Sequence, residues 1–108
     1  MRLADKVVFV TGAARGMGLV ATRMFAEQGA KIIAGDINEA GLAAVINELP
    51  EELQGAVLPV LGSVSSSADV ARMIDEGVAK FGKLNVLYNN AGIMPNEASP
   101  LLIAVNAS

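Results

Sequence analysis

Cysteine, histidine and tryptophan are all absent from this chain of 108 residues. Without cysteine or histidine, the chain cannot form a disulfide, hold zinc in a Cys/His cluster or use an imidazole for acid–base catalysis. A metal ion would need carboxylates alone, and no acidic segment has the spacing of a metal-binding loop. The sequence therefore predicts no metal site.

Basic residues are also scarce. Eight lysines and arginines stand against eleven acids, which gives a formal net charge of −3, and the basic residues are scattered. Binding a phosphate backbone needs a concentrated basic surface, so no nucleic-acid partner is expected. No apolar run approaches the ~20 residues of a membrane helix, and the first residues lack the long apolar segment of a signal peptide. We therefore expect no membrane partner and a cytoplasmic location.

Aromatic residues make up only 4% of the chain, whereas hydrophobic residues of all kinds make up 53%. The aliphatic residues fall in short, separated runs, which favours an α/β sheet covered by helices. Strands are expected at residues 6–11, 31–36, 56–61 and 84–89, and helices at residues 17–28, 39–49 and 66–81.

Right-handed crossovers place these strands in the order 3-2-1-4, in one doubly wound parallel sheet over residues 1–108. Pro59 lies inside the third strand and fits its position at an edge, where a missing amide donor costs little. The chain is expected to stop before a fifth strand, so that the fourth strand is a bare edge. The spacing of the first helix predicts a buried face that contains Met17, Val20, Ala21, Met24 and Phe25.

A glycine-rich turn joins the first expected strand to the first helix. Gly12, Gly16 and Gly18 each lack a Cβ where the backbone must turn tightly or approach a ligand closely. The helix that begins near Met17 offers amide N–H groups and a positive dipole end, which suit a pyrophosphate. An ordinary turn between a strand and a helix is the alternative interpretation.

Asp36 ends the second strand, 18 positions after Gly18, with Ile37 beside it. A carboxylate there can accept hydrogen bonds from both hydroxyls of an adenosine ribose and would repel a 2′-phosphate. Together with the glycine turn, it predicts a Rossmann-type dinucleotide site. The alternative is an acid that only favours the dipole of the next helix.

Arg15 lies in the glycine turn, where a basic residue approaches a 2′-phosphate in some dinucleotide-binding folds. A solvated turn residue is the alternative. The placement of Asp36 is the more constrained of the two, so we expect NAD as the cofactor rather than NADP.

Two motifs resemble the signatures of the short-chain dehydrogenase/reductase family. They are Thr11-Gly12-x-x-x-Gly16-x-Gly18 and Asn89-Asn90-Ala91-Gly92. The resemblance spans residues 3–92. It implies the cofactor-binding half of an oxidoreductase that, when complete, transfers hydride between a nicotinamide cofactor and an alcohol or ketone. It also implies that Asn89 steadies the central strand, while Asn90, Ala91 and Gly92 line the ribose and nicotinamide side of the site.

The sequence departs from the family pattern after the third strand. The family usually has an Asp-Val pair there, whose carboxylate meets the adenine amino group. In this chain Ser63 and Val64 take those positions. Ser63 is expected to offer a weaker hydrogen bond, while Val64 can still pack on the adenine ring. Plain strand-end residues without a ligand are the alternative.

The catalytic Ser and Tyr-x-x-x-Lys of the family lie beyond its second motif, whereas this chain ends at Ser108 and its only tyrosine, Tyr88, is followed four residues later by Gly92. Without them, hydride transfer has no proton relay. Asn106 resembles the active-site Asn of the family but arrives only 14 positions after Gly92. A polar residue near the chain end is the alternative interpretation of Asn106.

Two other functions compete with a dehydrogenase fragment. A non-catalytic nucleotide-binding or interaction module would use the bare fourth strand to self-associate. A methyltransferase fragment that binds S-adenosylmethionine also has a glycine turn and an acid after its second strand, but Arg15 and the motif at 89–92 disfavour it. The absence of Gly-Lys-Ser/Thr excludes a P-loop phosphotransferase.

Overall fold

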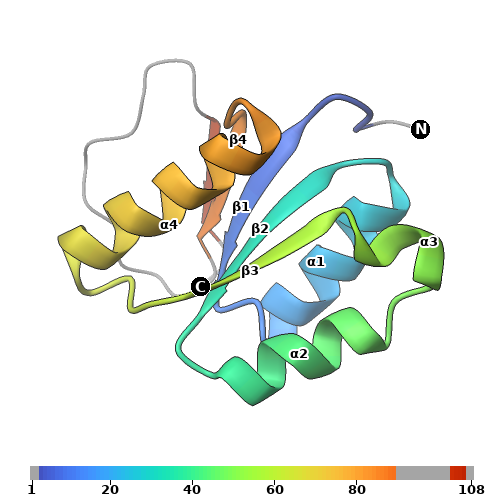
Figure 1. The fold of residues 1–108 in the computed structure, drawn as a ribbon, viewed down its shortest axis with the longest axis horizontal. Helices are drawn as coiled ribbons and strands as arrows, with labels where there is room; N and C mark the ends of the chain where they lie inside the picture. Colours follow the sequence, from blue (N-terminus) through green and yellow to red (C-terminus); the bar gives the residue numbers. More distant parts are fainter. Residues whose placement is uncertain (1–2, 90–102, 107–108) are drawn as a thin grey trace.

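Strands and helices alternate along the chain and form one sheet with helices on both sides (Figure 1). A computed structural model describes residues 3–89 and 103–106. The strands are β1 (Val7–Thr11), β2 (Lys31–Asp36), β3 (Val57–Leu61), β4 (Val86–Asn89) and β5 (Ile103–Asn106). The helices are α1 (Gly16–Glu27), α2 (Glu39–Asn47), α3 (Glu51–Gln54) and α4 (Ser67–Phe81).

All paired strands are parallel, in the order β3-β2-β1-β4-β5. The expected α/β class and the order 3-2-1-4 of the first four strands are confirmed. The winding reverses between β1 and β4, because β2 and β3 lie on one side of β1 and the later strands on the other. In sheets of this kind, ligands bind at the carboxyl ends of the strands near that reversal.

The expectation that the chain stops before a fifth strand is wrong. β5 pairs with β4 along its whole length, from Val86 with Ile103 to Asn89 with Asn106. A parallel connection needs about a dozen residues, and positions 90–102 supply them. Because β4 is paired on both sides, it is not the bare edge through which self-association was expected.

β3 is the edge strand that Pro59 indicated. Pro59 is in register with Ala34 of β2, the one described strand that pairs with β3. At the carboxyl end of β3, the Arg72 guanidinium donates a hydrogen bond to the Leu61 carbonyl. The edge therefore has one residue without an N–H and one carbonyl already engaged, which limits further strand pairing.

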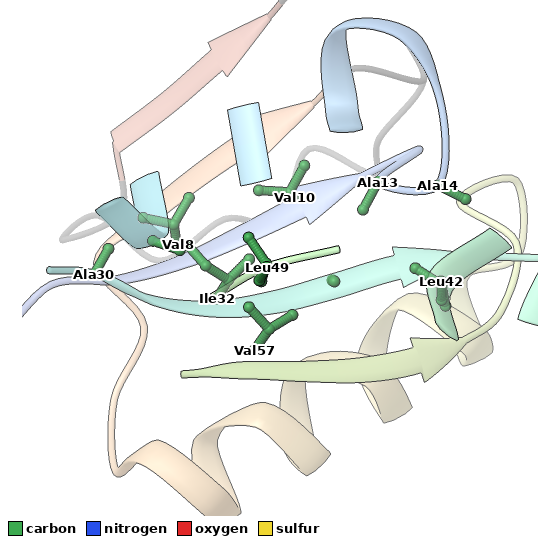
Figure 2. Packing of buried hydrophobic residues seen from close by; sticks show 11 residues of the cluster. Val8, Val10, Ala13, Ala14, Ala30, Ile32, Leu42, Leu49 and Val57 are labelled. Carbon is green, nitrogen blue, oxygen red and sulfur yellow. The ribbon is translucent and has the colours of Figure 1, made fainter. Parts of the chain in front are cut away.

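One hydrophobic core lies between the sheet and the pair of helices α1 and α2. Figure 2 shows Val8 and Val10 of β1 near Ile32 of β2 and Val57 of β3, with Leu42 of α2 in the same cluster. All five side chains are at most 5% exposed. Val8 and Val10 are alternate positions of β1, as expected for side chains on one face of the sheet.

A second core lies on the opposite face, under α4 (Figure 1). It contains Val7 and Phe9 of β1, Ile33 of β2 and Met73 of α4, among which Phe9, Ile33 and Met73 are completely buried. Every residue of β1 is buried, three on one face and two on the other, which explains why the strand is apolar from Val7 to Val10.

The ends of the helices follow local signals in most cases. The Ser66 hydroxyl accepts from the Asp69 amide at the start of α4, and Gly82, with φ +86°, ends that helix. α2 ends at Asn47, slightly before the expected Leu49, and the short helix α3 after Pro50 was not expected. Val78 of α4 is 37% exposed.

The predicted buried face of α1 is wrong for Met17, Val20 and Met24, whereas Phe25 is partly buried and packs against the core. Met17, Val20 and Met24 are 59%, 43% and 57% exposed. The buried residues are instead small, namely Gly18, Ala21, Thr22 and Ala26. Small side chains let a helix backbone approach the sheet closely, so the helix turns its small face inward and its methionines outward.

Candidate functional site

A pocket of about 300 Å³ lies where the carboxyl ends of β1, β2 and β3 come together. Its lining is formed by Gly12, Arg15, Gly35, Asp36, Ile37, Gly62, Ser63 and Val64. Six of these residues were expected at the site, from three separate segments of the sequence. The sheet topology is what brings them together.

The glycine turn has the backbone conformation that its residues suggested. Gly12 and Gly16 have φ values of +64° and +57°, which are strained for a residue with a side chain. A Cβ on Gly16 would meet no atom within 4 Å, so the conformation, and not crowding by protein atoms, requires glycine there. The same open space is available to a ligand.

The amino end of α1 is suited to an anion. Arg15 is its N-cap, and within the described residues no side chain caps the helix there or places an acid in its first turn. The first intrahelical bond runs from the Leu19 amide to the Arg15 carbonyl, at 3.2 Å. The amides of Gly16, Met17 and Gly18 precede that bond, so they are the groups a helix leaves for an external acceptor.

Asp36 is buried to 7% exposure and both of its carboxylate oxygens accept hydrogen bonds from the backbone. Oδ2 accepts from the Ala14 amide at 3.0 Å, and Oδ1 accepts from the Asn38 amide at 3.0 Å. These bonds fix the side chain and tie the glycine turn to the end of β2. Each carboxylate oxygen has a second lone pair, so the group can still accept from a ligand.

Ser63 and Val64 follow β3, which is separated by β2 from β1 and the glycine turn that follows it. The Ser63 amide donates to Asp69 Oδ2 at 2.9 Å, and its hydroxyl lies 2.7 Å from the Ser65 hydroxyl. Val64 packs partly against the core under α4. Ile37, at the end of β2, is 69% exposed. Two aliphatic residues and one serine therefore contribute to the lining of the pocket.

Gly35 and Gly62 also line the pocket and were not singled out from the sequence. A Cβ on Gly35 would lie 2.9 Å from Phe9 Cε1 and 3.2 Å from Met73 Sδ. The available signal was the position of each glycine next to the carboxyl end of a strand, where close backbone approach is common.

The remaining expected site residues are placed only in part. Asn90, Ala91 and Gly92 lie outside the described residues. Asn106 belongs to β5, where its backbone is in register with Asn89 of β4. Its side chain lies outside the described part of the structure.

Metal and membrane features do not appear in the described part of the chain. No cluster of three or more carboxylates there has the arrangement of a metal site. Among the same residues, no helix combines the length and apolarity needed to cross a membrane.

The sheet order and the pocket at its carboxyl edge define a Rossmann-type fold. Comparison with known proteins gives the family. A sequence model described as short chain dehydrogenase matches residues 6–105. The chain belongs to the short-chain dehydrogenase/reductase family.

Two curated relatives illustrate the similarity. The 3-oxoacyl-(acyl-carrier-protein) reductase FabG of Thermotoga maritima is 42% identical over 93 residues, which cover 86% of this chain and 37% of that protein. The 3beta-hydroxysteroid dehydrogenase 2 of Eggerthella lenta is 42% identical over 95 residues, which cover 87% of this chain and 36% of that protein. The chain thus spans little more than a third of the length of these relatives.

Solved structures with short-chain dehydrogenase or reductase names match the fold of this chain. A 3-ketoacyl-(acyl-carrier-protein) reductase from Brucella melitensis, complexed with NADH, matches with a TM-score of 0.76 and 38% identity, over 84% of this chain and 36% of that one. A short chain dehydrogenase from Bacillus anthracis matches with a TM-score of 0.77 and 30% identity, over 85% and 37% of the two chains.

Proposed function

We propose that residues 1–108 form a single cofactor-binding domain of an NAD-dependent short-chain dehydrogenase/reductase. One observation carries the proposal: the Asp36 carboxylate is fixed in the same pocket as the glycine turn. A pyrophosphate on the turn then places its attached ribose at the carboxylate. The NADH complex of the similar Brucella reductase supports the same cofactor here.

Each part of the pocket has a separate task in this proposal. The amides of Gly16, Met17 and Gly18 bind the pyrophosphate at the positive end of α1. Asp36 accepts from the ribose hydroxyls, while Ile37 and Val64 contact the adenine ring. The residues present fit the cofactor, because Gly12 and Arg15 of the glycine turn line the same pocket as the Asp36 carboxylate and the aliphatic residues Ile37 and Val64.

The preference for NAD over NADP depends on charge. The carboxylate of Asp36 is nearly buried and accepts two backbone hydrogen bonds, which hold it in place beside the expected ribose. A 2′-phosphate on the ribose would place a second negative group beside the carboxylate, and the repulsion between the two groups would weaken the binding of NADP. Arg15 lines the same pocket and opposes this effect, but it is exposed and its charge is screened.

The nicotinamide side of the site is assigned to Asn90, Ala91 and Gly92, which follow β4, with Asn106 as the active-site asparagine at the end of β5. The cofactor supplies hydride exchange, and the complete protein acts on an alcohol or ketone in the cytoplasm. The neighbouring carboxyl ends of β1 and β4 support this arrangement, because they lie where the winding of the sheet reverses.

Calorimetric titration of the 108-residue chain with NAD⁺ and NADP⁺ tests the proposal. We expect NAD⁺ to bind at least about tenfold more tightly, a difference of about 1.4 kcal/mol. Arg15→Ala should widen the ratio, because it removes the cation that favours a 2′-phosphate. Equal affinities for the two cofactors would contradict NAD preference, and no binding of either would contradict the proposed function.

A further inference from the structure

The pocket that contains Asp36 is also lined by one serine and two aliphatic residues. In the proposed function, Asp36 holds the ribose, so the base attached to that sugar lies among Ile37, Ser63 and Val64. These three residues line the same pocket as Asp36. The inference that follows rests on the proposed function, and it concerns which base these three residues accept.

The backbone amide of Ser63 is not available to a base, because it donates to Asp69 Oδ2 at 2.9 Å. The Asp69 carboxylate is thereby held behind the backbone of Ser63, and its other oxygen lies 3.8 Å from the Arg72 guanidinium. Asp69 is not among the residues that line the pocket. The base therefore meets no fixed carboxylate acceptor from α4.

The Ser63 hydroxyl can act in either direction. It accepts from the Ser65 amide at 3.2 Å and lies 2.7 Å from the Ser65 hydroxyl, where either oxygen can be the donor. When Ser65 donates, the hydrogen of Ser63 points elsewhere and can bind an acceptor. When Ser63 donates to Ser65, one lone pair of its oxygen remains to accept. Rotation of two exposed hydroxyls interconverts the two arrangements.

The 6-position of a purine distinguishes the bases that this hydroxyl meets. Adenine has an amino group there and needs an acceptor, whereas hypoxanthine has a carbonyl and needs a donor. A carboxylate accepts only, so it would favour adenine. Contacts from Ile37 and Val64 to the ring face do not depend on the 6-substituent.

We propose that this chain does not discriminate between adenine and hypoxanthine at the purine 6-position, and that Ser63 is the residue responsible. The site accepts the hypoxanthine analogue of NAD as readily as NAD itself. Serine in place of an acceptor-only side chain removes the penalty that a carbonyl at the 6-position would otherwise meet.

Binding of NAD⁺ and nicotinamide hypoxanthine dinucleotide to the 108-residue chain, measured by calorimetry, tests the proposal. The two dissociation constants should agree within about threefold. Ser63→Asp should weaken the hypoxanthine analogue relative to NAD⁺ by at least about tenfold, because its carboxylate cannot donate to the carbonyl. Ser63→Ala is the matched control: it should weaken both ligands and leave their ratio within about threefold.

A wild-type preference for NAD⁺ above about tenfold would overturn the inference while leaving the proposed function intact. A Ser63→Asp variant that binds both ligands equally would also overturn it. If Ser63→Asp fails to fold, as judged by circular dichroism, the ratio of the two dissociation constants in the wild type and in Ser63→Ala still tests the inference. Failure of NAD⁺ itself to bind the wild type would overturn the proposed function and the inference together.

Discussion

The Thr11 hydroxyl donates a hydrogen bond of 3.0 Å to Oδ1 of Asn89 across the carboxyl ends of β1 and β4. Both side chains are buried, with exposures of 0% and 3%. At the other end of β4, the side-chain Oδ1 of Asn85 accepts from the backbone amide of Val7 at 2.9 Å. The backbone amide of Asn85 donates to the carbonyl of Val7. Asparagine side chains thus fasten β4 to β1 at both ends, where the winding of the sheet reverses.

Removing the Asn89 side chain should destabilise the fold. In Asn89→Ala the Thr11 hydroxyl loses a buried acceptor, and the expected cost is about 1–3 kcal/mol of unfolding free energy. Urea denaturation followed by circular dichroism measures it. Asn47→Ala, at an exposed position on α2, is the control and should stay within about 0.5 kcal/mol of the wild type. Equal stability of the two variants would show that the Thr11–Asn89 bond contributes little.

Replacing Asp36 by Asn should affect stability and cofactor choice together. One oxygen becomes an NH₂ group, which then faces the N–H of Ala14 or of Asn38, donor against donor. We expect a loss of about 1–3 kcal/mol in unfolding free energy. The preference for NAD⁺ over NADP⁺ should also fall, because the carboxylate charge is gone.

Thermal unfolding with and without each cofactor measures both effects of Asp36→Asn. Glu39→Gln is the matched control, since it removes an exposed carboxylate three positions away and should change neither quantity appreciably. An Asp36→Asn variant that keeps the wild-type ratio of cofactor affinities would contradict the ribose role of Asp36.

Two methionines provide a direct comparison of exposed and buried apolar side chains. Met24 on α1 is 57% exposed, whereas Met73 on α4 is completely buried. Met73→Ala should cost about 2–5 kcal/mol because it leaves a cavity beside Phe9 and Ile33. Met24→Ala should change stability by less than about 0.5 kcal/mol. Chemical denaturation measures both, and equal costs would contradict the observed orientation of α1.

The orientation of α1 shows why part of the fold could not be predicted from the sequence. The apolar periodicity identified the helix correctly, but it favoured Met17 and Met24 as buried residues. Close contact with the sheet instead favours the face of the helix that carries small side chains. A pattern that only separates apolar from polar residues does not distinguish small apolar side chains from large ones. The first four strands were predictable because each is a separate apolar run between turn residues.

The fifth strand and one contact of Asp36 were also beyond the reach of the sequence. β5 is only four residues long, too short for its apolar pattern to distinguish a strand from chance. For the site, motif spacing identified six residues that line one pocket. The contact between the Ala14 amide and Asp36 was not predictable, because it joins residues 22 positions apart.

α4 lies against the sheet at Gly77, so a methyl group there should be destabilising. A Cβ on Gly77 would overlap Cδ1 and Cγ1 of Ile33, which is completely buried. Gly77→Ala should cost about 1–3 kcal/mol despite the better helix propensity of alanine. The double variant Gly77→Ala with Ile33→Val should recover part of this loss when compared with Ile33→Val alone.

Gly55→Ala is the control for Gly77→Ala. A Cβ on Gly55 would meet nothing within 4 Å, and its φ of −69° suits any residue. It should leave stability unchanged or raise it by up to about 1 kcal/mol, because alanine restricts the unfolded chain. Urea denaturation of both variants gives the comparison. A neutral Gly77→Ala would show that α4 can move away from β2 at little cost.

The 108-residue chain should bind NAD⁺ without oxidising alcohols. Its only tyrosine, Tyr88, belongs to β4 and packs edge to face on Phe25, with ring centroids 5.6 Å apart. Gly92, and not a lysine, stands four positions after Tyr88, so this tyrosine has no Tyr-x-x-x-Lys partner for proton transfer. Absorbance at the NADH band during incubation with NAD⁺ and simple alcohols should stay flat, while calorimetry of the same sample shows binding. Turnover that Tyr88→Phe abolishes would contradict this prediction, because that substitution keeps the ring contact and removes only the hydroxyl.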